Sequence, residues 1–241
     1  MSPTVEVFPG IAAVASAAAE RIAGVLRRPG PSVLVLAAGK TMVPVYRELA
    51  ALNARRRAPF RRATTFNLDE LRVPPGDPRS FRIFMERYLF SPVNLPPERI
   101  YFLRGDTADP VGECRRFERD LYRLGPPDLA LVGIGENCHV AYLEPARALP
   151  PRTSLVTLSA GTRRGLAASG ISPKPREALT MGIETILSAR EILLVAVGKE
   201  KAGAVADALL GRVTSRCPAS LLSLHPRLTV LLDRRAASGL P

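Results

Sequence analysis

The feature that most constrains the fold of this chain is a repeated alternation between short apolar runs and segments with helical periodicity. Residues 11–28 place apolar side chains at three- and four-residue steps, which predicts an amphipathic helix, and a Pro-Gly-Pro turn ends it. Residues 32–38 form a continuous apolar run bounded by turn residues. Such a run is typical of a strand that is buried on both faces in a parallel sheet.

The same alternation continues to the end of the chain. Further strands are predicted at residues 64–68, 128–135, 154–158, 191–198 and 228–233. Further helices are predicted from about residue 44 and at residues 80–89, 110–124, 178–188 and 201–210. Strands that alternate with helices predict an α/β fold with an open, mostly parallel sheet and helices on both faces, a Rossmann-like three-layer sandwich.

One domain is expected to span residues 1–241. The sequence shows no internal repeat, low-complexity segment or interdomain linker, and the proline-punctuated residues 172–176 are interpreted as a loop within the domain. Ligands of open α/β sheets bind outside the carboxyl ends of the strands. We therefore expect the functional site in the residues that follow four strand ends, which are Leu36, Leu68, Ile134 and Val197.

Composition excludes several classes of protein. The three cysteines, Cys114, Cys138 and Cys217, form no Cys-X-X-Cys pair, which argues against a secreted disulfide framework and against a zinc ribbon. No apolar run reaches the roughly 18–20 residues that cross a bilayer, and the start of the chain lacks the basic and apolar regions of a signal peptide. We therefore expect a soluble cytoplasmic protein without a membrane partner.

The net charge of +12, from 34 Lys and Arg against 22 Asp and Glu, suggests nucleic acid or an anionic small molecule as a partner. The positive residues are mostly arginines in short scattered groups, such as residues 55–57, 61–62 and 234–235. No single basic helix or basic stripe with interleaved aromatic residues is visible. This scatter favours a solvated surface, and we expect no nucleic-acid partner.

Two of the predicted strand ends carry residues suited to binding phosphate. Gly39, Lys40 and Thr41 form a small-residue turn that leads into a helix, whose free amides and positive dipole end favour an anion. The spacing is not that of a Walker motif, and a tight strand-to-helix turn alone would also explain Gly39. After Val197, a glycine and Lys201 precede a helix in the same way and form a second possible anion site.

The other two strand ends carry acid–base groups. Asp69 and Glu70 are adjacent carboxylates where a ligand would lie, and a partly buried carboxylate there can act as a general base. A helix cap or an ion pair with an arginine would also explain them. His139 follows a glycine-rich strand end, with Glu144 five residues later. A carboxylate near one imidazole nitrogen leaves the other nitrogen free to move a proton, although a structural histidine is the alternative.

Metal chemistry is not expected from this sequence. His225, which precedes a proline, is interpreted as structural, so His139 is the only histidine predicted at the site. Too few histidines and cysteines lie near one another to ligate an obligatory metal ion.

Five motifs occur in order along the chain: Thr65-Phe-Asn-Leu-Asp69-Glu70, Pro78-Arg-Ser-Phe-Arg-Ile-Phe-Met85, Gly133-Ile-Gly-Glu-Asn-Cys-His139-Val-Ala-Tyr-Leu-Glu144-Pro145, Ala178-Leu-Thr-Met-Gly-Ile183 and Leu224-His-Pro226. Together they resemble the glucosamine-6-phosphate deaminase (glucosamine-6-phosphate isomerase) family from about residue 5 to the C-terminus. The related 6-phosphogluconolactonases share the sheet and the Gly-X-Gly-X-X-X-His turn. The motifs around Phe66-Asn67, Glu144-Pro145 and residues 178–182 are closer to the deaminases.

The resemblance implies an enzyme that opens the ring of an amino sugar phosphate, moves a proton between C2 and C1, and expels ammonia to give fructose 6-phosphate. It implies no cofactor, because the carbonyl of the substrate is the electron sink. Asp69 matches the general base of the family, His139 its ring-opening acid–base group, and Glu144 the carboxylate that orients this histidine. Lys201 matches a phosphate-binding lysine, and residues 39–41 match the phosphate loop.

The partner implied by the resemblance is a small-molecule sugar phosphate. The chain ends soon after Asp233 and lacks the longer tail of some hexameric, allosterically regulated members of the family. A monomer or a small homo-oligomer is therefore expected.

The sequence departs from the family pattern near the histidine. Asn137 and Cys138 stand where the family has Asp-Gly, and Leu143 stands in place of an asparagine before Glu144. The amide of Asn137 can accept a hydrogen bond from His139, but it cannot stabilise an imidazolium by charge.

The phosphate loop also departs from the pattern, with Ala38-Gly-Lys-Thr-Met42 in place of Thr-Gly-Ser-Thr-Pro, and Ala168 stands where an arginine is expected. Lys40, Arg163 or Arg164 can replace the missing positive charge. Two other functions stay open. One is a phosphosugar-binding sensor with little turnover, and the other is an enzyme of the same fold that acts on a different phosphosugar, including lactone hydrolysis.

Overall fold

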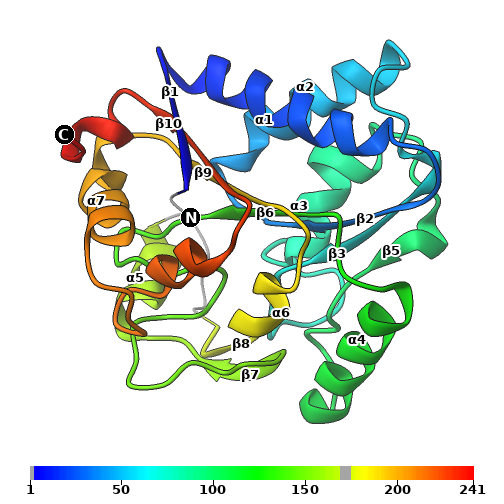
Figure 1. The fold of residues 1–241 in the computed structure, drawn as a ribbon. Helices are drawn as coiled ribbons and strands as arrows, with labels where there is room; N and C mark the ends of the chain where they lie inside the picture. The colour runs from blue at the N-terminus through cyan, green and yellow to red at the C-terminus, as the bar shows by residue number, and fades with distance from the viewer. Residues whose placement is uncertain (1–2, 169–174) are drawn as a thin grey trace.

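Among the described residues, the central sheet has seven parallel strands (Figure 1). The computed structural model describes residues 3–168 and 175–241. The strands lie in the order β1 (Thr4–Phe8), β10 (Leu228–Asp233), β9 (Ile192–Ala196), β6 (Leu129–Gly133), β2 (Ser32–Leu36), β3 (Ala63–Asn67) and β5 (Ile100–Tyr101). Every residue of β2 and β9 is buried, which explains why these strands are continuous apolar runs in the sequence. The predicted α/β fold with a mostly parallel sheet is confirmed.

Helices cover both faces of this sheet (Figure 1). Helices α1 (Ile11–Leu26) and α2 (Met42–Ala54) lie side by side on one face, and α4 (Pro110–Leu124) and α6 (Ile183–Leu187) lie on the other. The remaining longer helices are α5 (Ala160–Ala168) and α7 (Ala202–Leu210). Short 3-10 turns occupy Phe60–Arg62, Pro97–Arg99, Lys199–Lys201, Pro218–Leu224 and Ala236–Gly239. The helices predicted at residues 11–28, 110–124 and 201–210 are confirmed.

A second, smaller sheet is antiparallel and was not predicted as a separate unit. It consists of β4 (Asp69–Leu71), β8 (Glu177–Thr180) and β7 (Ser154–Thr157), in that order. The strand predicted at residues 154–158 therefore exists as β7, but it belongs to this sheet and not to the parallel one. Strand β4 continues from the end of β3 after a single intervening residue, Leu68, and so the small sheet begins at the edge where the parallel strands end.

The helix predicted at residues 178–188 is wrong in its first half. Residues 177–180 form β8, and the helix α6 begins only at Ile183. Pairing of β8 with a strand on each side outweighs the local helical periodicity. Gly182 separates the strand from the helix, and a Cβ at this position would overlap the backbone of Pro151 and Arg152. A side chain there would push the strand–helix junction away from this backbone.

Other elements differ from the sequence predictions in extent. Residues 80–89 form α3 (Phe81–Met85), which continues as a single π-helical segment, η2 (Glu86–Phe90). Strand β1 was not predicted, because it is an edge strand whose Val5 and Val7 are exposed. Residues 172–174 of the predicted loop lie outside the described residues. Within the described ranges, no helix is long and apolar enough to cross a membrane.

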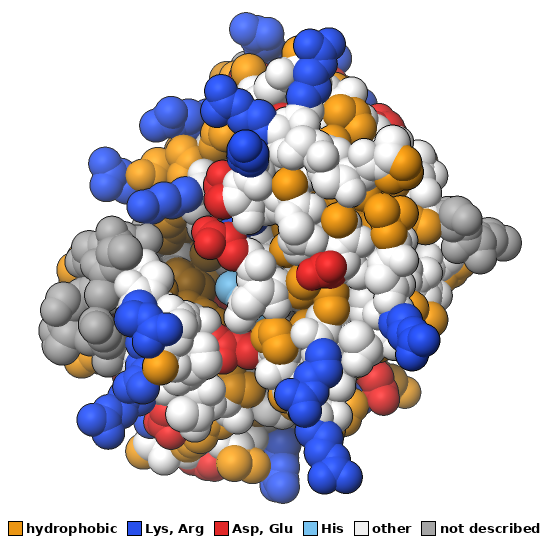
Figure 2. Space-filling view, turned by 90° about the vertical axis from the view of Figure 1, so that its left-hand side faces the viewer, with side chains coloured by type: hydrophobic (Ala, Val, Ile, Leu, Met, Phe, Trp, Pro, Cys, Tyr) orange, Lys and Arg blue, Asp and Glu red, His pale blue; other side chains and the backbone are white. Residues whose placement is uncertain are grey.

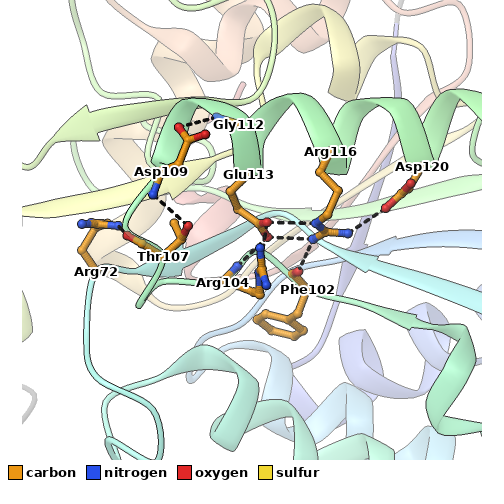
Figure 3. Close-up of polar contacts among 9 residues, drawn as sticks. All are labelled: Arg72, Phe102, Arg104, Thr107, Asp109, Gly112, Glu113, Arg116 and Asp120. Carbon is orange, nitrogen blue, oxygen red and sulfur yellow. Dashed lines mark hydrogen bonds and ion pairs between the residues drawn. The ribbon is translucent and has the colours of Figure 1, made fainter.

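A buried carboxylate fixes the segment between β5 and α4 (Figure 3). The side chain of Glu113, which has no exposed surface, accepts hydrogen bonds from the backbone N–H of Arg104 at 2.8 Å and from Nη2 of Arg116 at 2.7 Å. Burial alone would raise the pKa of Glu113, but these hydrogen bonds and charges hold it below its usual range. Arg72, just after β4, donates to the carbonyl of Thr107 at 2.6 Å, so the same segment also braces the small sheet.

Candidate active site

Two adjoining cavities open at the carboxyl ends of the parallel strands. The first, the Asp69 cavity, has a volume of about 170 Å³ and is lined by residues that include Gly39, Thr41, Asp69, His139 and Tyr142. The second, the Lys201 cavity, has a volume of about 540 Å³ and is lined by residues that include Asn137, His139, Tyr142, Thr162 and Lys201. Figure 2 shows a hollow with a histidine side chain inside it, while the Lys and Arg side chains on that face are scattered.

Asp69 is placed in the first cavity by its strand in the small sheet, which begins where β3 ends. Its strand, β4, runs antiparallel to β8 with Asp69 opposite Thr180. The side chain is buried at 7% exposure, yet it lines the Asp69 cavity. Burial, with a smaller contribution from the charge of Glu70, raises the pKa of Asp69 to about 8. A carboxylate with such a pKa is a strong enough base to take a proton from carbon near neutral pH.

Glu70 has a different environment from its neighbour. Its carboxylate accepts hydrogen bonds from the backbone N–H groups of Leu71 (2.8 Å), Phe81 (2.8 Å) and Arg82 (2.9 Å) and from the hydroxyl of Ser80 (2.7 Å). These contacts hold the N-terminus of α3. Glu70 lines neither the Asp69 cavity nor the Lys201 cavity. The contacts of Glu70 are therefore those of a helix cap, which was the alternative to ligand binding.

His139 is oriented by its amide neighbour. Nδ1 of His139 lies 2.5 Å from Oδ1 of Asn137. Because a carboxamide oxygen only accepts, Nδ1 carries the proton and Nε2 is left as the free acceptor. Burial and then the charge of Lys201 lower the pKa of His139, and the charge of Glu144 opposes them. The imidazole is therefore neutral near pH 7 and can act as a base.

The turn that carries His139 requires a particular backbone. The N–H of Gly135 donates to the carbonyl of His139 at 2.9 Å, and the N–H of Cys138 donates to the carbonyl of Gly135 at 3.0 Å. The imidazole lies so close to Gly135 that a Cβ there would overlap it. Cys138 has a φ of 67°, in the left-handed region that favours glycine. This backbone agrees with the glycine that the family pattern places at the position of Cys138.

Glu144 contacts α5 and makes no hydrogen bond to His139 in the described structure. Its carboxylate accepts hydrogen bonds from the N–H of Ser159 at 3.0 Å, from the Ser159 hydroxyl at 3.1 Å, and from the hydroxyl of Thr162. The expectation that Glu144 orients His139 by direct contact is therefore corrected: Asn137 makes the contact, and Glu144 acts on the histidine through its charge. Leu143, next to it, is buried in the core.

The predicted phosphate-binding residues are only partly brought together. Gly39, with a φ of 133°, and Thr41 line the Asp69 cavity at the start of α2, whereas the exposed Lys40 does not line it. Lys201, at the start of α7, lines the Lys201 cavity. Arg163 lies in α5 and lines neither cavity.

Helix α5 carries Arg163 and ends at Ala168. The buried Nε of Arg163 has no hydrogen-bond partner within the described residues. Ala168 is the last residue of α5, and its side chain lies outside what the structure describes. No positive charge from α5 is therefore seen at the cavity walls in the described ranges.

His225 is structural, as predicted, because its Nε2 lies 2.7 Å from the carbonyl of Ala189 and its Nδ1 accepts from the N–H of Arg227. Tyr142 and Thr162 line the cavities and were not singled out from the sequence, although Tyr142 stands inside the motif between His139 and Glu144. Within the described residues, no group of three or more His, Cys, Asp or Glu side chains is arranged to hold a metal ion.

Comparison with known proteins gives consistent matches over nearly the whole chain. A family model described as glucosamine-6-phosphate isomerases/6-phosphogluconolactonase matches residues 10–231. Glucosamine-6-phosphate deaminase 2 of Giardia intestinalis is 43% identical over 91% of this chain and 85% of its own length. Glucosamine-6-phosphate deaminase 1 of Bacillus subtilis (strain 168) is 40% identical over 93% of this chain and 94% of its own length.

Solved structures give the same picture of the fold. The structure of a monomeric glucosamine-6-phosphate deaminase superposes with a TM-score of 0.93 at 38% identity, covering 98% of this chain and 99% of its own. A 6-phosphogluconolactonase from Trypanosoma cruzi superposes with a TM-score of 0.80 at 20% identity, covering 100% of this chain and 98% of its own, which is a likeness of fold alone.

Proposed function

Because this chain belongs to the family of glucosamine-6-phosphate isomerases and 6-phosphogluconolactonases, we propose that it is a glucosamine-6-phosphate deaminase. The reaction converts glucosamine 6-phosphate and water to fructose 6-phosphate and ammonia. The observation that carries the proposal is the shared lining of one cavity by Asp69 and His139, a buried carboxylate with a raised pKa and a neutral imidazole.

The proposed roles follow from these two environments. His139, through its free Nε2, moves the proton that opens the sugar ring and exposes the C1 aldehyde. Asp69 then takes the proton from C2 and returns a proton to C1, which converts the C2 amine into an imine. Water hydrolyses this imine to the ketone and releases ammonia. When the C2 proton leaves, the C1 carbonyl of the substrate accepts the electron pair of the broken C–H bond. The sequence of steps therefore uses no cofactor.

The phosphate group is assigned to the positive end of the site. Lys201 supplies a charge at the wall of the Lys201 cavity, and Gly39 and Thr41 offer a small-residue turn at the N-terminus of α2. We propose a single domain over residues 1–241 that works in the cytoplasm as a monomer or small homo-oligomer. The monomeric state given for the solved relative supports the smaller assembly.

Lactone hydrolysis is the weaker candidate for this site. Its support is the fold, because the 6-phosphogluconolactonase from Trypanosoma cruzi is 20% identical, against 38–43% for the deaminases compared above. A sensor with little turnover has one observation in its favour. Asn137, an amide, lies against His139 and cannot stabilise an imidazolium by charge.

The deciding experiment measures ammonia and fructose 6-phosphate after purified protein is mixed with glucosamine 6-phosphate. Equal amounts of the two products are expected, and the Asp69→Asn variant should form them at least about 10²-fold more slowly. Hydrolysis of 6-phosphogluconolactone is measured in parallel. Release of acid from the lactone without ammonia from the amino sugar would assign the lactonase activity. Tight binding of the amino sugar phosphate without either product would assign the sensor.

A further inference from the structure

Tyr142 occupies the boundary between the two cavities. Among the described residues that line the Asp69 cavity, only His139 and Tyr142 also line the Lys201 cavity. A phosphosugar with its phosphate at Lys201 and its C2 atom at Asp69 must therefore pass these two side chains. The role of His139 is included in the proposed reaction, and Tyr142 has none there.

The position of the Tyr142 ring is fixed from two sides. Its backbone N–H donates to the hydroxyl of Thr180 at 3.1 Å, and Thr180 lies opposite Asp69 in the small sheet. Its ring stacks on the ring of Phe81, with the centroids 6.0 Å apart and an interplanar angle of 10°. Phe81 is in turn the first residue of α3, whose N-terminus is held by Glu70. The phenol is thus held in place before any ligand binds.

The hydroxyl of Tyr142 is a hydrogen-bond donor without an acceptor among the residues that the structure describes. Burial, and then the charges of Asp69, Glu70 and Glu144, raise the pKa of Tyr142 well above its usual value, so the hydroxyl keeps its proton. Within the part of the chain that the structure describes, no protein group accepts a hydrogen bond from it. Tyr142 is only 7% exposed and lines both cavities, so a ligand in either cavity lies beside the residue that carries this unpaired donor.

We infer that the Tyr142 hydroxyl donates a hydrogen bond to an oxygen atom of the bound sugar chain, and so determines specificity for a polyhydroxylated, open-chain sugar phosphate. This inference rests on the proposed function and deepens it. A hydroxyl or carbonyl oxygen of the sugar accepts the hydrogen bond from the Tyr142 hydroxyl, and this contact fixes the sugar chain between Asp69 and His139. Inorganic phosphate carries no sugar chain, so its binding at Lys201 should not depend on this hydroxyl.

The first test compares wild type with Tyr142→Phe, which removes one oxygen atom and keeps the ring that stacks on Phe81. A fall in kcat/KM for glucosamine 6-phosphate of about three- to tenfold is expected, the scale of one neutral hydrogen bond. The melting temperature should be unchanged, because no hydrogen bond within the described protein is lost. Tyr122→Phe, at a tyrosine that is 88% exposed, is the matched control and should leave both quantities unchanged. An unchanged kcat/KM in Tyr142→Phe overturns the inference.

The second test separates this inference from the proposed reaction, because it measures only binding. Glucitol 6-phosphate, an acyclic polyol phosphate, is titrated by calorimetry against wild type and Tyr142→Phe, with inorganic phosphate as the reference ligand. The polyol phosphate should bind about three- to tenfold more weakly to the variant, while phosphate binds equally to both. Equal behaviour of the two proteins toward the polyol phosphate, including no binding by either, overturns the inference. Failure of wild type to release ammonia overturns the proposed function instead.

Discussion

The imidazole of His139 lies directly against Gly135, in the space that any Cβ at position 135 would fill. The histidine therefore depends on a residue four positions earlier that has no side chain. The hydrogen bond from the N–H of Gly135 to the carbonyl of His139 closes the same turn and holds the backbone of the two residues together.

Gly135→Ala should displace the imidazole by an ångström or more and cost about 10²-fold in kcat, because acid–base groups are sensitive to misplacement on this scale. Gly24→Ala, in helix α1, is the matched control, since its nearest contact is the flexible end of Arg27 at 3.9 Å. The control should keep full activity. Turnover by Gly135→Ala at the wild-type rate would show that His139 can act from a different position.

The pH dependence of the reaction should report the raised pKa of Asp69. Because the general base must be ionised, kcat/KM should rise with pH up to about 8 and then level off. Asp69→Asn should lower kcat by about 10²-fold or more with a modest change in binding, and it should abolish this limb of the profile. A rise with pH in the Asp69→Asn variant that matches wild type would assign the limb to another group.

The same carboxylate should make the folded state less stable at high pH. Its pKa is raised on folding from an ordinary 3.8 to about 8, so between these values the folded state holds a proton that the unfolded state has released. Asp69 thus destabilises the fold as the pH rises through this window, by about 1.4 kcal/mol per pH unit, and the loss is complete above about pH 8.

This loss of stability is checked by urea unfolding at several pH values between 5 and 9. Asp69→Asn should remove the contribution of Asp69 to the slope of unfolding free energy against pH. The variant should be more stable than wild type at the alkaline end of the range. Asp106→Asn, at an exposed position, should leave the slope as it is. A wild-type stability that rises with pH over the same window would contradict the buried, protonated state of Asp69.

The contact between Asn137 and His139 gives a prediction about ring opening. Replacing the amide by a carboxylate puts a negative charge 2.5 Å from Nδ1, which stabilises an imidazolium and raises the pKa of His139. Asn137→Asp should therefore raise turnover of ring-form substrate by about tenfold, the effect of a change of one pKa unit. Turnover of an open-chain substrate should change little.

The control for this variant is Asn94→Asp, the same chemical change at an exposed position. Stopped-flow measurements with the anomers and with an open-chain analogue separate the two steps. A slower Asn137→Asp enzyme would mean that the amide is the better partner for this histidine.

The position of the phosphate is tested through its effect on unfolding. A ligand that binds only the folded state stabilises it by mass action, by about 2.7 kcal/mol at 100 times its Kd. Inorganic phosphate should raise the melting temperature of wild type, and Lys201→Ala should lose most of this shift. Lys199→Ala, two residues earlier and exposed, should keep it. A shift that persists in Lys201→Ala would place the phosphate elsewhere.

The parallel sheet could be predicted because its strands are buried on both faces and leave an unbroken apolar run in the sequence, as in β2 and β9. The general location of the site followed from the same strands, since Asp69 and His139 lie in the segments that follow the ends of β3 and β6. The small sheet could not be predicted in this way. Residues 177–180 become a strand through pairing with β4, about a hundred residues earlier, and their local periodicity is helical.

The different roles of Asp69 and Glu70 also could not be predicted from the sequence. Both are carboxylates, and only the folded chain shows that one lines a cavity while the other accepts four hydrogen bonds near α3. The orientation of His139 by Asn137 instead of Glu144 depends in the same way on side-chain distances. Burial, which raises the pKa of Asp69, arises from residues scattered along the whole chain.

The alternation of Asp69 and Glu70 along β4 has a consequence for how this segment can evolve. Neighbouring residues of a strand point to opposite faces, so a shift of the chain by one position would turn each of the two carboxylates to the face opposite its present one. Substitutions here change one role at a time, whereas an insertion or deletion between Asn67 and Asp69 displaces both carboxylates at once. We therefore expect lineages of this protein to vary freely in the length of surface loops and to keep a constant number of residues across this junction.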